Sequence, residues 1–518
     1  MEQLPNMTTF GDVEGVQGVE DACDYVVIGT GAAGATAARV LAEAGLDVVM
    51  LEEGSWIPRQ SLRQDMYSSL KSLWRDMGFQ GTESRAVVAV LQGCTVGGST
   101  AVNSAIIHRL PEQIHAEWER AYGATEHIAY ADLESAWERI EDELRIQVTP
   151  DEVLGRNGRL LRDACERKGY SVQSIVRNVE GCKGTSRCSQ GCPTAQRQSM
   201  NNAYVPRALA DGARLYTDCR AEKVIREGGR AVGVRGRFRR TLTRERGPEL
   251  TVRARRGVLV ACSAIQTPIF LQANGIGRQS RLVGQRLQMH PGVALAGIFD
   301  EPMHCWFGAT QSVETLHFWE DRYKIETINL PPELASMRLP GVGTALMEQF
   351  GAFKHMAIWG VQCRMRAHGR VRRGALTGRT IVKYDMLPED VRLAKTALVT
   401  MAEMMFLEGA QQVLPGVHGL PGRVSDMDTM RRIFDIPDDP GIFHAIGSHL
   451  FGTAVMGQDP RSSVVGTDGQ CHELPGLYVM DSSVFPTNMG VNPQHTICGV
   501  SWLFAQRLAN EERATAAA

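Results

Sequence analysis

The feature that most constrains the fold of this chain is a glycine-rich turn near the N-terminus. An apolar run of strand length, residues 25–28, leads into the spacing Gly-x-Gly-x-x-Gly at Gly29, Gly31 and Gly34. A helix-forming stretch follows over residues 35–44. The pattern predicts a strand, a tight turn and a helix whose free N–H groups can meet an anionic ligand.

A second apolar strand completes this unit and ends in an acid. Residues 48–51 form that strand, and Glu52 follows about 20 residues after the turn. In a βαβ dinucleotide-binding unit, the three glycines permit the turn, the approach of a pyrophosphate and close packing of the helix. A carboxylate at Glu52 can accept from both ribose hydroxyls and repels a 2′-phosphate, which disfavours NADP. The unit alone leaves both NAD and FAD open.

Length and composition exclude several classes of protein. With 518 residues, the chain exceeds the usual size of one hydrophobic core, so we expect two domains or one elaborated domain. Hydrophobic residues make up 43% and the formal net charge is −2, which gives no general attraction to nucleic acid or membranes. No run approaches the ~18 apolar residues of a membrane span, and the first residues lack the pattern of a secretory signal. We expect a cytoplasmic protein.

A second glycine-rich segment, residues 93–104 (GCTVGGSTAVNS), has two interpretations. It can be a plain turn between strands. Its density of Gly, Ser and Thr between apolar flanks also suits a backbone that lies close to a flat or phosphorylated ligand.

Three cysteines, Cys182, Cys188 and Cys192, have a spacing that resembles a metal knuckle. They lack a clear fourth ligand, so packed thiols or one local disulfide are favoured over zinc or an iron–sulfur cluster.

An arginine-rich segment, residues 235–256, follows a hairpin signal at Glu227-Gly228-Gly229. A nucleic-acid patch is one interpretation. The arginines partly alternate with apolar residues and have acids among them, which favours the solvated face of a hairpin.

The composition changes over residues 292–441, where short strand-like runs precede a methionine-rich helix expected at residues 388–411. This block is interpreted as a substrate-side domain. Three informative segments follow it: residues 447–457 around His449, residues 477–486 around Asp481, and residues 490–497 around Asn492 and Pro493. A proline at a helix start leaves N–H groups free for a ligand.

Taken together, these segments resemble the glucose–methanol–choline (GMC) family of flavin alcohol oxidoreductases. The resemblance rests on the N-terminal unit, GCTVGGSTAVN, SAIQTPIFLQANGIG, VGQRLQMHP, SHLFGTAVMG and LYVMDSSVFPTNMGVNPQHTI, and it is weak over residues 292–441. It implies FAD rather than NAD.

The expected fold class is α/β: an FAD-binding Rossmann-like domain with a parallel sheet in ββα layers, plus an α+β substrate domain with an antiparallel sheet. We expect residues 20–110, 200–291 and 441–510 to form the FAD-binding domain. Residues 111–199 and 292–440 would form the substrate-binding or cap region. Residues 1–19 would be a leader and residues 511–518 a tail.

The resemblance also implies the cofactor contacts. The phosphate glycines correspond to Gly29, Gly31 and Gly34, and the ribose acid to Glu52. The loop carrying Gly97, Gly98, Ser99 and Asn103 would run along the isoalloxazine and pyrophosphate. The backbone of Val224 would contact adenine, and Asp481 would reach the phosphate or ribityl chain. Asn492 and Pro493 would lie near the pyrimidine end. Val102 stands where some relatives carry a histidine bonded to the flavin, so the FAD is expected to be non-covalent.

The family's catalytic pair corresponds to His449 and Asn492. Flavin N5 would take a hydride from a small-molecule alcohol, His449 would take the hydroxyl proton, and Asn492 would orient the oxygen. His495 is not expected to be the second catalytic residue, and His290 is interpreted as a packing or turn residue. Reduced flavin would pass its electrons to O2 or to another acceptor. A non-redox lyase of the same family and a partner-dependent subunit remain alternatives, and an oligomer is possible.

Overall fold

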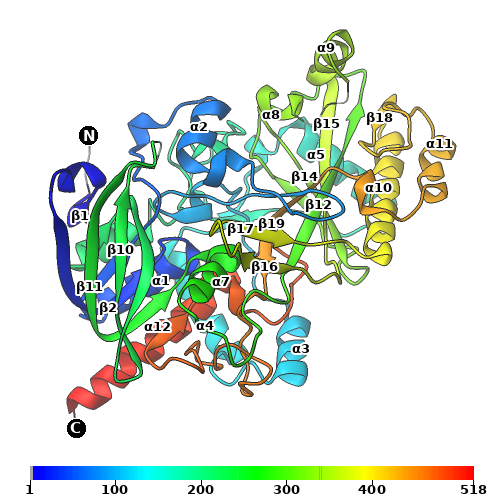
Figure 1. Ribbon diagram of the computed structural model, residues 1–518. Coiled ribbons are helices and arrows are strands. Elements are labelled where there is room, and N and C mark those ends of the chain that lie inside the picture. The colour runs from blue at the N-terminus through cyan, green and yellow to red at the C-terminus, as the bar shows by residue number, and fades with distance from the viewer. Residues whose placement is uncertain (1–3, 242, 338, 340, 518) are drawn as a thin grey trace.

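The computed structural model describes residues 4–241, 243–337, 339 and 341–517. Two eight-stranded sheets dominate the molecule, one at the left and one at the right of Figure 1. The first sheet has the order β1-β8-β3-β2-β11-β10-β9, with β20 paired to β11. Its strands are β1 (Met7–Thr8), β2 (Gly18–Ile28), β3 (Val48–Leu51), β8 (Arg214–Tyr216), β9 (Cys219–Glu227), β10 (Arg230–Arg239), β11 (Arg246–Val260) and β20 (Leu477–Val479).

The central part of this first sheet is parallel. β1, β8, β3, β2 and β11 pair in parallel in that order, and β20 is parallel to β11, whereas β9, β10 and β11 form an antiparallel meander at one edge. The hairpin predicted at residues 227–229 is confirmed, because Glu227 pairs with Arg230. β11 pairs with β2 more than 200 residues earlier in the chain, so segments from distant parts of the sequence build this sheet.

The helix of the glycine-rich unit, α1 (Ala32–Glu43), packs against the first sheet. Its residues 33–42 are all buried, since α12 (Gln494–Ala517) and α6 (Tyr204–Ala210) cover its outer side. Small side chains permit this close approach: a Cβ on Gly34 would lie 1.9 Å from the carbonyl oxygen of Gly29. α12 in turn packs on α4 (Tyr130–Glu143), while α2 (Met66–Leu73), α3 (Glu112–Tyr122) and α7 (Ser263–Ala273) complete the helices around this half.

The second sheet has the order β4-β19-β12-β15-β14-β13-β6, with β18 paired to β12. It is antiparallel except between β19 and β4. Its strands are β4 (Val88–Val90), β6 (Gln173–Ser174), β12 (Gln288–Ile298), β13 (Val313–Thr315), β14 (Tyr323–Thr327), β15 (Met356–Cys363), β18 (Gln412–Leu414) and β19 (Ala445–Phe451). The expected α/β class with a second, antiparallel sheet is confirmed.

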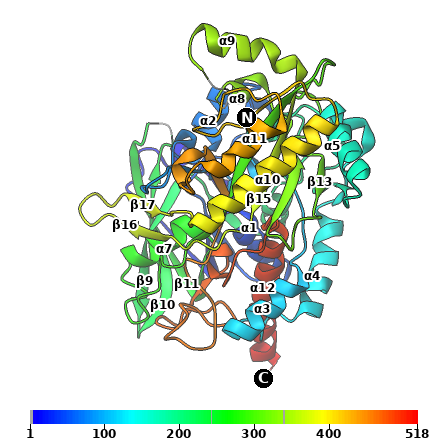
Figure 2. The same cartoon turned by 90° about the vertical axis from the view of Figure 1, so that its right-hand side faces the viewer.

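Two long helices cover the outer face of the second sheet. α10 (Pro388–Leu407) and α5 (Gly155–Lys168) contact its strands and each other, and Figure 2 shows both helices in front of this sheet. Met401, Met404 and Met405 of α10 are buried, as expected for core-filling methionines. The predicted helix over residues 388–411 is correct in its start and ends four residues earlier, because Gly409 has a positive φ and leaves the helical conformation.

The remaining elements are short. They are α8 (Pro332–Ser336), α9 (Thr344–Gly351), α11 (Met427–Arg431), the pair β5 (Gln147–Val148) with β7 (Val176–Arg177), and the pair β16 (Arg370–Arg373) with β17 (Thr380–Lys383).

The domain division proposed from the sequence stays a prediction. Two strands lie close to its proposed boundaries. β1 lies within the proposed leader and adds a parallel strand to the first sheet. β19 lies within the proposed FAD-binding range 441–510 and belongs to the second sheet. The C-terminal segment therefore contributes to both sheets.

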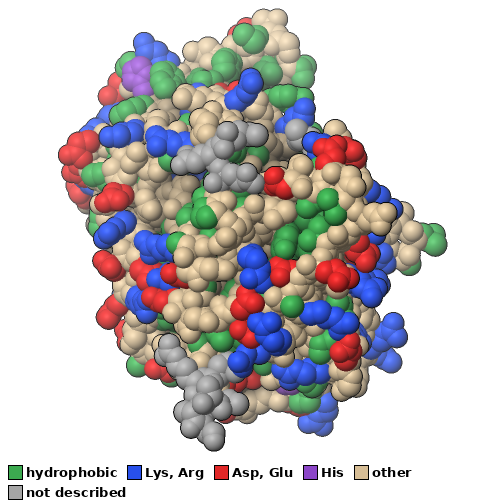
Figure 3. Space-filling view, turned by 90° about the vertical axis from the view of Figure 1, so that its left-hand side faces the viewer, with side chains coloured by type: hydrophobic (Ala, Val, Ile, Leu, Met, Phe, Trp, Pro, Cys, Tyr) green, Lys and Arg blue, Asp and Glu red, His purple; other side chains and the backbone are tan. Residues whose placement is uncertain are grey.

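The arginine-rich segment lies on β10, β11 and the turn between them. Its side chains pair with acids, as in the ion pairs Arg239–Glu222 at 2.7 Å and Arg240–Glu245 at 3.0 Å. Figure 3 shows this side of the molecule, with basic and acidic side chains interspersed. Among the described residues, no helix has the length and apolar character needed to cross a bilayer.

Candidate active site

A cavity of about 1520 Å³ is lined by residues from both sheets. Pockets for a single small ligand usually measure about 300–1,000 Å³, so this cavity has room for a larger cofactor together with a substrate. Of the residues predicted to bind cofactor or to act in catalysis, the lining includes Gly29, Gly31, Glu52, Gly98, Ser99, Asn103, Asp481, His449, Asn492 and Pro493. The structure thus brings together side chains that are spread over the whole length of the sequence.

The turn before α1 forms one end of the cavity. Gly31 is the N-cap of α1 and provides no side-chain cap, so the first N–H groups of the helix are left for another acceptor. A Cβ on Gly31 would meet nothing within 4 Å, which means that open space adjoins its backbone. Gly98 packs against Gly31, and Gly97 donates its N–H to Thr30 Oγ1 at 3.0 Å. The two glycine-rich segments therefore form one backbone cradle that fits a pyrophosphate.

The two predicted acids lie along this cradle. Glu52 is buried and accepts from Thr30 Oγ1 at 2.7 Å and from the N–H of Gly54 at 2.9 Å. Asp481 accepts from the N–H groups of Ser263, at 3.0 Å, and Ser483, at 2.8 Å. Burial raises the pKa of both carboxyl groups. Each acid is fixed in place by its neighbours before a ligand binds.

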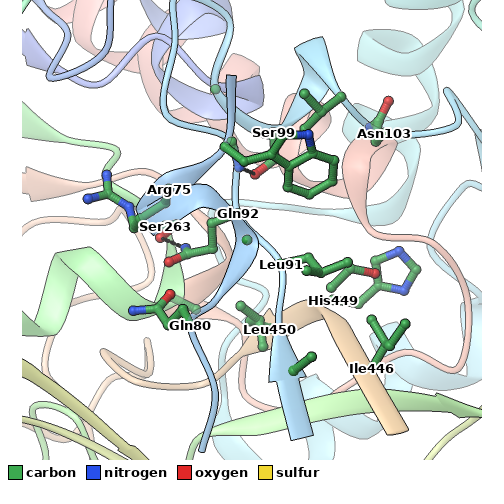
Figure 4. Close-up of a pocket in the computed structure, with 18 of the residues that line it drawn as sticks. Arg75, Gln80, Leu91, Gln92, Ser99, Asn103, Ser263, Ile446, His449 and Leu450 are labelled. Carbon is green, nitrogen blue, oxygen red and sulfur yellow. Dashed lines mark hydrogen bonds between the residues drawn. The ribbon is translucent and has the colours of Figure 1, made fainter. Parts of the chain in front are cut away.

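The loop that carries Asn103 follows the same wall. Asn103 donates from Nδ2 to Gln494 Oε1 at 2.6 Å, which ties the loop to the first residue of α12. Nearby, Gln92 Nε2 donates to Ser263 Oγ at 2.6 Å, and Figure 4 shows this contact on the same side of the cavity as Arg75. Val224 instead donates its N–H to Asn274 Oδ1 at 2.9 Å, and the preceding residues 219–223 line the cavity.

The predicted catalytic pair meets at the opposite wall. His449 projects from β19 of the second sheet, and Asn492 lies just before α12. His449 Nε2 and Asn492 Nδ2 are 3.4 Å apart. Burial, together with the positive charge of Lys324, lowers the pKa of His449 to about 3. The imidazole is therefore neutral near neutral pH and can accept a proton.

His290 is a site residue that the sequence interpretation missed. It lies on β12, its Nδ1 is 3.4 Å from Nδ1 of His449, and the two rings meet edge to face. Its Nε2 lies 3.2 Å from Asn488 Oδ1 and 3.0 Å from the backbone nitrogen of Gly490. His290 is buried and packs against neighbouring rings, as the sequence interpretation had it, but it also lines the cavity and contacts the His449 ring. A sequence signal for a role of His290 in the site was available, because this histidine lies in VGQRLQMHP, one of the motifs identified in the sequence.

Lys324 is a second missed residue. Its side chain is fully buried on β14, and Nζ donates to Asn492 Oδ1 at 2.7 Å and to Glu314 Oε2 at 2.8 Å. Nζ also lies 3.0 Å from Glu326 Oε2. A lysine in a short strand gives no sequence signal of burial, because its partners are set by strand pairing.

His495 points away from this pair. Its Nε2 lies 3.0 Å from Glu141 Oε1, and its ring packs against Trp137 at 5.8 Å between centroids. Register therefore places Asn492, rather than His495, beside His449.

The three cysteines of the knuckle-like segment are free thiols. Arg177 Nη2 donates to Cys188 Sγ at 3.2 Å and Nη1 to Cys182 Sγ at 3.7 Å. Burial raises the pKa of Cys188, but Arg177 and Arg197 outweigh it, so the net direction is downward. Within the part of the chain that the structure describes, no three His, Cys, Asp or Glu side chains are grouped to hold a metal ion.

Comparison with protein families gives two matches on this chain. Residues 23–292 match a family model described as GMC oxidoreductase, and residues 363–501 match a second model with the same description. The matched ranges contain both glycine-rich segments and both members of the His449–Asn492 pair.

Relatives with known sequences agree with these matches. An uncharacterized GMC-type oxidoreductase of Mycobacterium tuberculosis is 35% identical over 492 residues, which cover 93% of this chain and 75% of the relative. A long-chain-alcohol oxidase of Arabidopsis thaliana is 28% identical over 513 residues, which cover 93% of this chain and 67% of that protein.

Solved structures share the fold at low identity. Pyridoxine 4-oxidase from Mesorbium loti aligns with a TM-score of 0.71 and 17% identity, covering 94% of this chain and 99% of that one. A formate oxidase of Aspergillus oryzae aligns with a TM-score of 0.74 and 15% identity, covering 96% and 99%.

Proposed function

The chain belongs to the GMC oxidoreductase family, and we propose that it catalyses the FAD-dependent oxidation of an alcohol to an aldehyde or ketone. One observation carries this proposal. A neutral imidazole, His449, and an amide, Asn492, stand 3.4 Å apart in the wall of a cavity that also contains a dinucleotide-binding turn. An acceptor for a proton and a donor for an oxygen are what alcohol oxidation requires of a protein.

The groups that would hold FAD are present along the cradle. The N–H groups at the start of α1 and the backbone of Gly97 and Gly98 would face the pyrophosphate, and Glu52 would accept from the ribose. The backbone of Val224 remains the proposed adenine contact, Asp481 the proposed phosphate or ribityl contact, and Asn492 and Pro493 would lie near the pyrimidine end. Val102 offers no nucleophile for a covalent link, so we propose non-covalent FAD.

The chain's own residues then divide the reaction between them. When bound, FAD supplies the acceptor for the hydride that leaves the alcohol carbon. His449 takes the hydroxyl proton at Nε2, which is available because burial keeps the ring neutral. Asn492 donates to the alcohol oxygen, where negative charge grows as the proton departs. His290 holds the far side of the His449 ring.

The shape of the cavity beside His449 favours an alcohol with an apolar body. Side chains alternate along a strand, and on β12 the residues in line with His290 are Gly292, Ala294 and Ala296, all of which line the cavity. Across from Ala294 on β15 lies Gly360, and Ile358 lies across from Ala296. This apolar channel (Gly292, Ala294, Ala296, Ile358 and Gly360) leads away from the pair. A long-chain-alcohol oxidase among the relatives supports the same substrate class.

Anaerobic mixing of the FAD-loaded protein with a panel of primary alcohols tests the proposal, with flavin absorbance as the signal. We expect bleaching, with faster reduction as the alkyl chain lengthens. His449→Ala should slow the reduction by about 10²–10⁴-fold while FAD stays bound, whereas His472→Ala, outside the cavity, should not.

Re-admission of air then identifies the acceptor, because rapid re-oxidation indicates an oxidase and slow re-oxidation another acceptor. Product formation with the flavin never reduced would replace the proposal with the lyase alternative. Reduction that depends on an added protein would indicate a partner-dependent subunit.

A further inference from the structure

Lys324 is a buried lysine with three polar contacts. Two of them neutralise its positive charge, and the third is not needed for that purpose. Glu314 and Glu326 lie 2.8 Å and 3.0 Å from Nζ and balance its charge. Burial lowers the pKa of Lys324, but these two carboxylates raise it above the ordinary value, so Nζ remains an ammonium. The further contact, at 2.7 Å, joins Nζ to Asn492 Oδ1.

That contact decides which way the Asn492 amide faces. An ammonium group has donors only, so the side-chain oxygen of Asn492, and not its nitrogen, must face Nζ. The nitrogen, Nδ2, is thereby turned to the opposite side, where it lies 3.4 Å from His449 Nε2. With Lys324 in place, Asn492 presents only N–H donors to the cavity, one toward His449 Nε2 and the other available to the reacting oxygen.

The same orientation acts on His449. An N–H directed at Nε2 favours the tautomer in which Nε2 holds the lone pair and Nδ1 holds the proton. Nδ1 then faces His290, 3.4 Å away. Nε2 is the atom that must accept the proton from the alcohol, so the lysine helps to set the base in its active form.

Building on the function proposed above, we propose that Lys324 is a positioning residue, which acts through Asn492 to aim the amide N–H at the alcohol oxygen and at His449 Nε2. The titratable groups that face it are Glu314, Glu326, His108, which lies 3.1 Å from Glu314, and His449.

The chain contains a matched control for the general cost of losing a buried lysine. Lys395 on α10 is also fully buried, and its Nζ pairs with Asp438 Oδ1 at 2.8 Å. Asp438 lies outside the cavity, and no contact joins this pair to His449 or Asn492 among the described residues. Lys395→Met therefore removes a buried, paired ammonium without touching the amide.

A double-mutant cycle on the FAD-loaded enzyme tests the proposal. The variants are Lys324→Met, Asn492→Ala, both together, and Lys395→Met, with the limiting rate of anaerobic flavin reduction as the measurement. Lys324→Met and Asn492→Ala should each slow reduction by about 10²-fold, the scale of losing one oriented donor. If the lysine acts through the amide, the double variant should be no slower than Asn492→Ala alone. Lys395→Met should change the rate by less than about threefold.

A binding measurement separates positioning from a general structural defect. The dissociation constant of trifluoroethanol, an alcohol that resists oxidation, is read from the perturbed flavin spectrum of each variant. Lys324→Met should lower the reduction rate far more than it weakens this binding, because the amide contact strengthens as charge develops. Equal loss in both measurements, or multiplicative effects in the double variant, would overturn the proposal.

A folding failure and a wrong assignment of Asn492 can each be distinguished from a failure of the inference about Lys324. If Lys324→Met does not fold because Glu314 is left unpaired, the charge-balanced variant Lys324→Met with Glu314→Gln takes its place in the cycle, against Glu314→Gln alone. If Asn492→Ala reduces flavin at the normal rate, the assignment of Asn492 in the proposed function is wrong. If Asn492→Ala is slow and Lys324→Met is not, only the inference about Lys324 is wrong.

Discussion

At the scale of single residues, the proposed chemistry depends on one imidazole, His449, that burial keeps neutral. Among the residues that the structure describes, no carboxylate pairs with His449 to stabilise its protonated form. Its polar contacts there are the imidazole of His290 and the amide of Asn492. Lys324, behind that amide, adds a positive charge that opposes protonation further. The arrangement is that of a base held ready, and it has a measurable consequence in pH.

We expect the rate of flavin reduction to hold its value well below the ordinary titration point of histidine. A base works only when unprotonated, so its acidic limb falls at its own pKa, and for His449 that pKa is shifted from 6.5 down to about 3. Between about pH 7 and pH 5, where an exposed histidine would become protonated, the rate should change by less than about twofold.

Stopped-flow reduction by one alcohol over this range measures it, with the FAD content checked at each pH. A rate that halves near pH 6.5 in step with protonation would show that His449 is not shielded in this way.

The sequence predicted some residues of the candidate site and missed others, according to whether they lie in a recognisable motif. His449 and Asn492 stand in motifs, and each was predicted together with its partner. The role of Lys324 could not be predicted from the sequence, because its partners Glu314 and Glu326 come together only when their strands pair in the second sheet. His290 was present in a motif, but its contact with His449 arises from the pairing of β12 with β19.

Among the elements, the turn from β2 into α1 fixes where an anionic ligand can lie. Gly34 is required for packing, because its Cβ would collide with the backbone of Gly29, and Gly31 borders open space. The two glycines therefore differ: Gly34 is needed for packing, and we expect Gly31 to be needed for the approach of the ligand.

Two alanine substitutions should separate these roles. Gly31 has a φ of −69°, which alanine adopts without strain, so Gly31→Ala should leave the fold intact and weaken FAD binding by at least about tenfold by filling the approach to the helix N-terminus. Gly34→Ala should destabilise the protein itself, by roughly 1–3 kcal/mol or more, because the clash is with backbone.

FAD retained on purification and the thermal unfolding midpoint are the two measurements. Equal loss of stability in both variants, or normal FAD binding by Gly31→Ala, would contradict the division.

The strand-to-helix units were predictable because they are local. Residues 48–51 form β3 as predicted, and the turn signal at residues 227–229 marks a hairpin, since both depend on neighbours in sequence. The second sheet was not predictable in order or register. Its strands are joined by long connections, and a short apolar run carries no information about which distant strand it pairs with.

Across the whole molecule, the cavity is lined by residues of both sheets: the first sheet leads into the glycine-rich cradle, and the second sheet carries His449, the proposed base. Neither sheet contains both, and Asn492, which follows the last strand in the chain and precedes α12, completes the pair beside β19. The lining of the second sheet is therefore free to set substrate size without disturbing the cofactor end.

A substitution deep in the apolar channel should change chain-length preference alone. Ala296 lies six residues beyond His290 on β12, a separation of about 20 Å along an extended strand. Ala296→Phe should raise the KM for long-chain alcohols by about tenfold or more, because the ring fills the far end of the channel, and should leave short alcohols within about twofold.

Steady-state rates across an alcohol series measure this, with the short alcohols as the internal control. A uniform loss for all lengths would place the substrate elsewhere in the cavity.

The pairing of β20 with β11 also has a consequence for biosynthesis. β20 adds to the parallel sheet, and Asp481, two residues after it, reaches the cavity, so this wall is absent until translation has passed this segment. The glycine-rich turn emerges from the ribosome first, but more than 440 further residues must follow before it faces this wall. We therefore expect a chain truncated before β20 to carry the glycine-rich turn and to bind FAD poorly, because this wall of the cavity is missing.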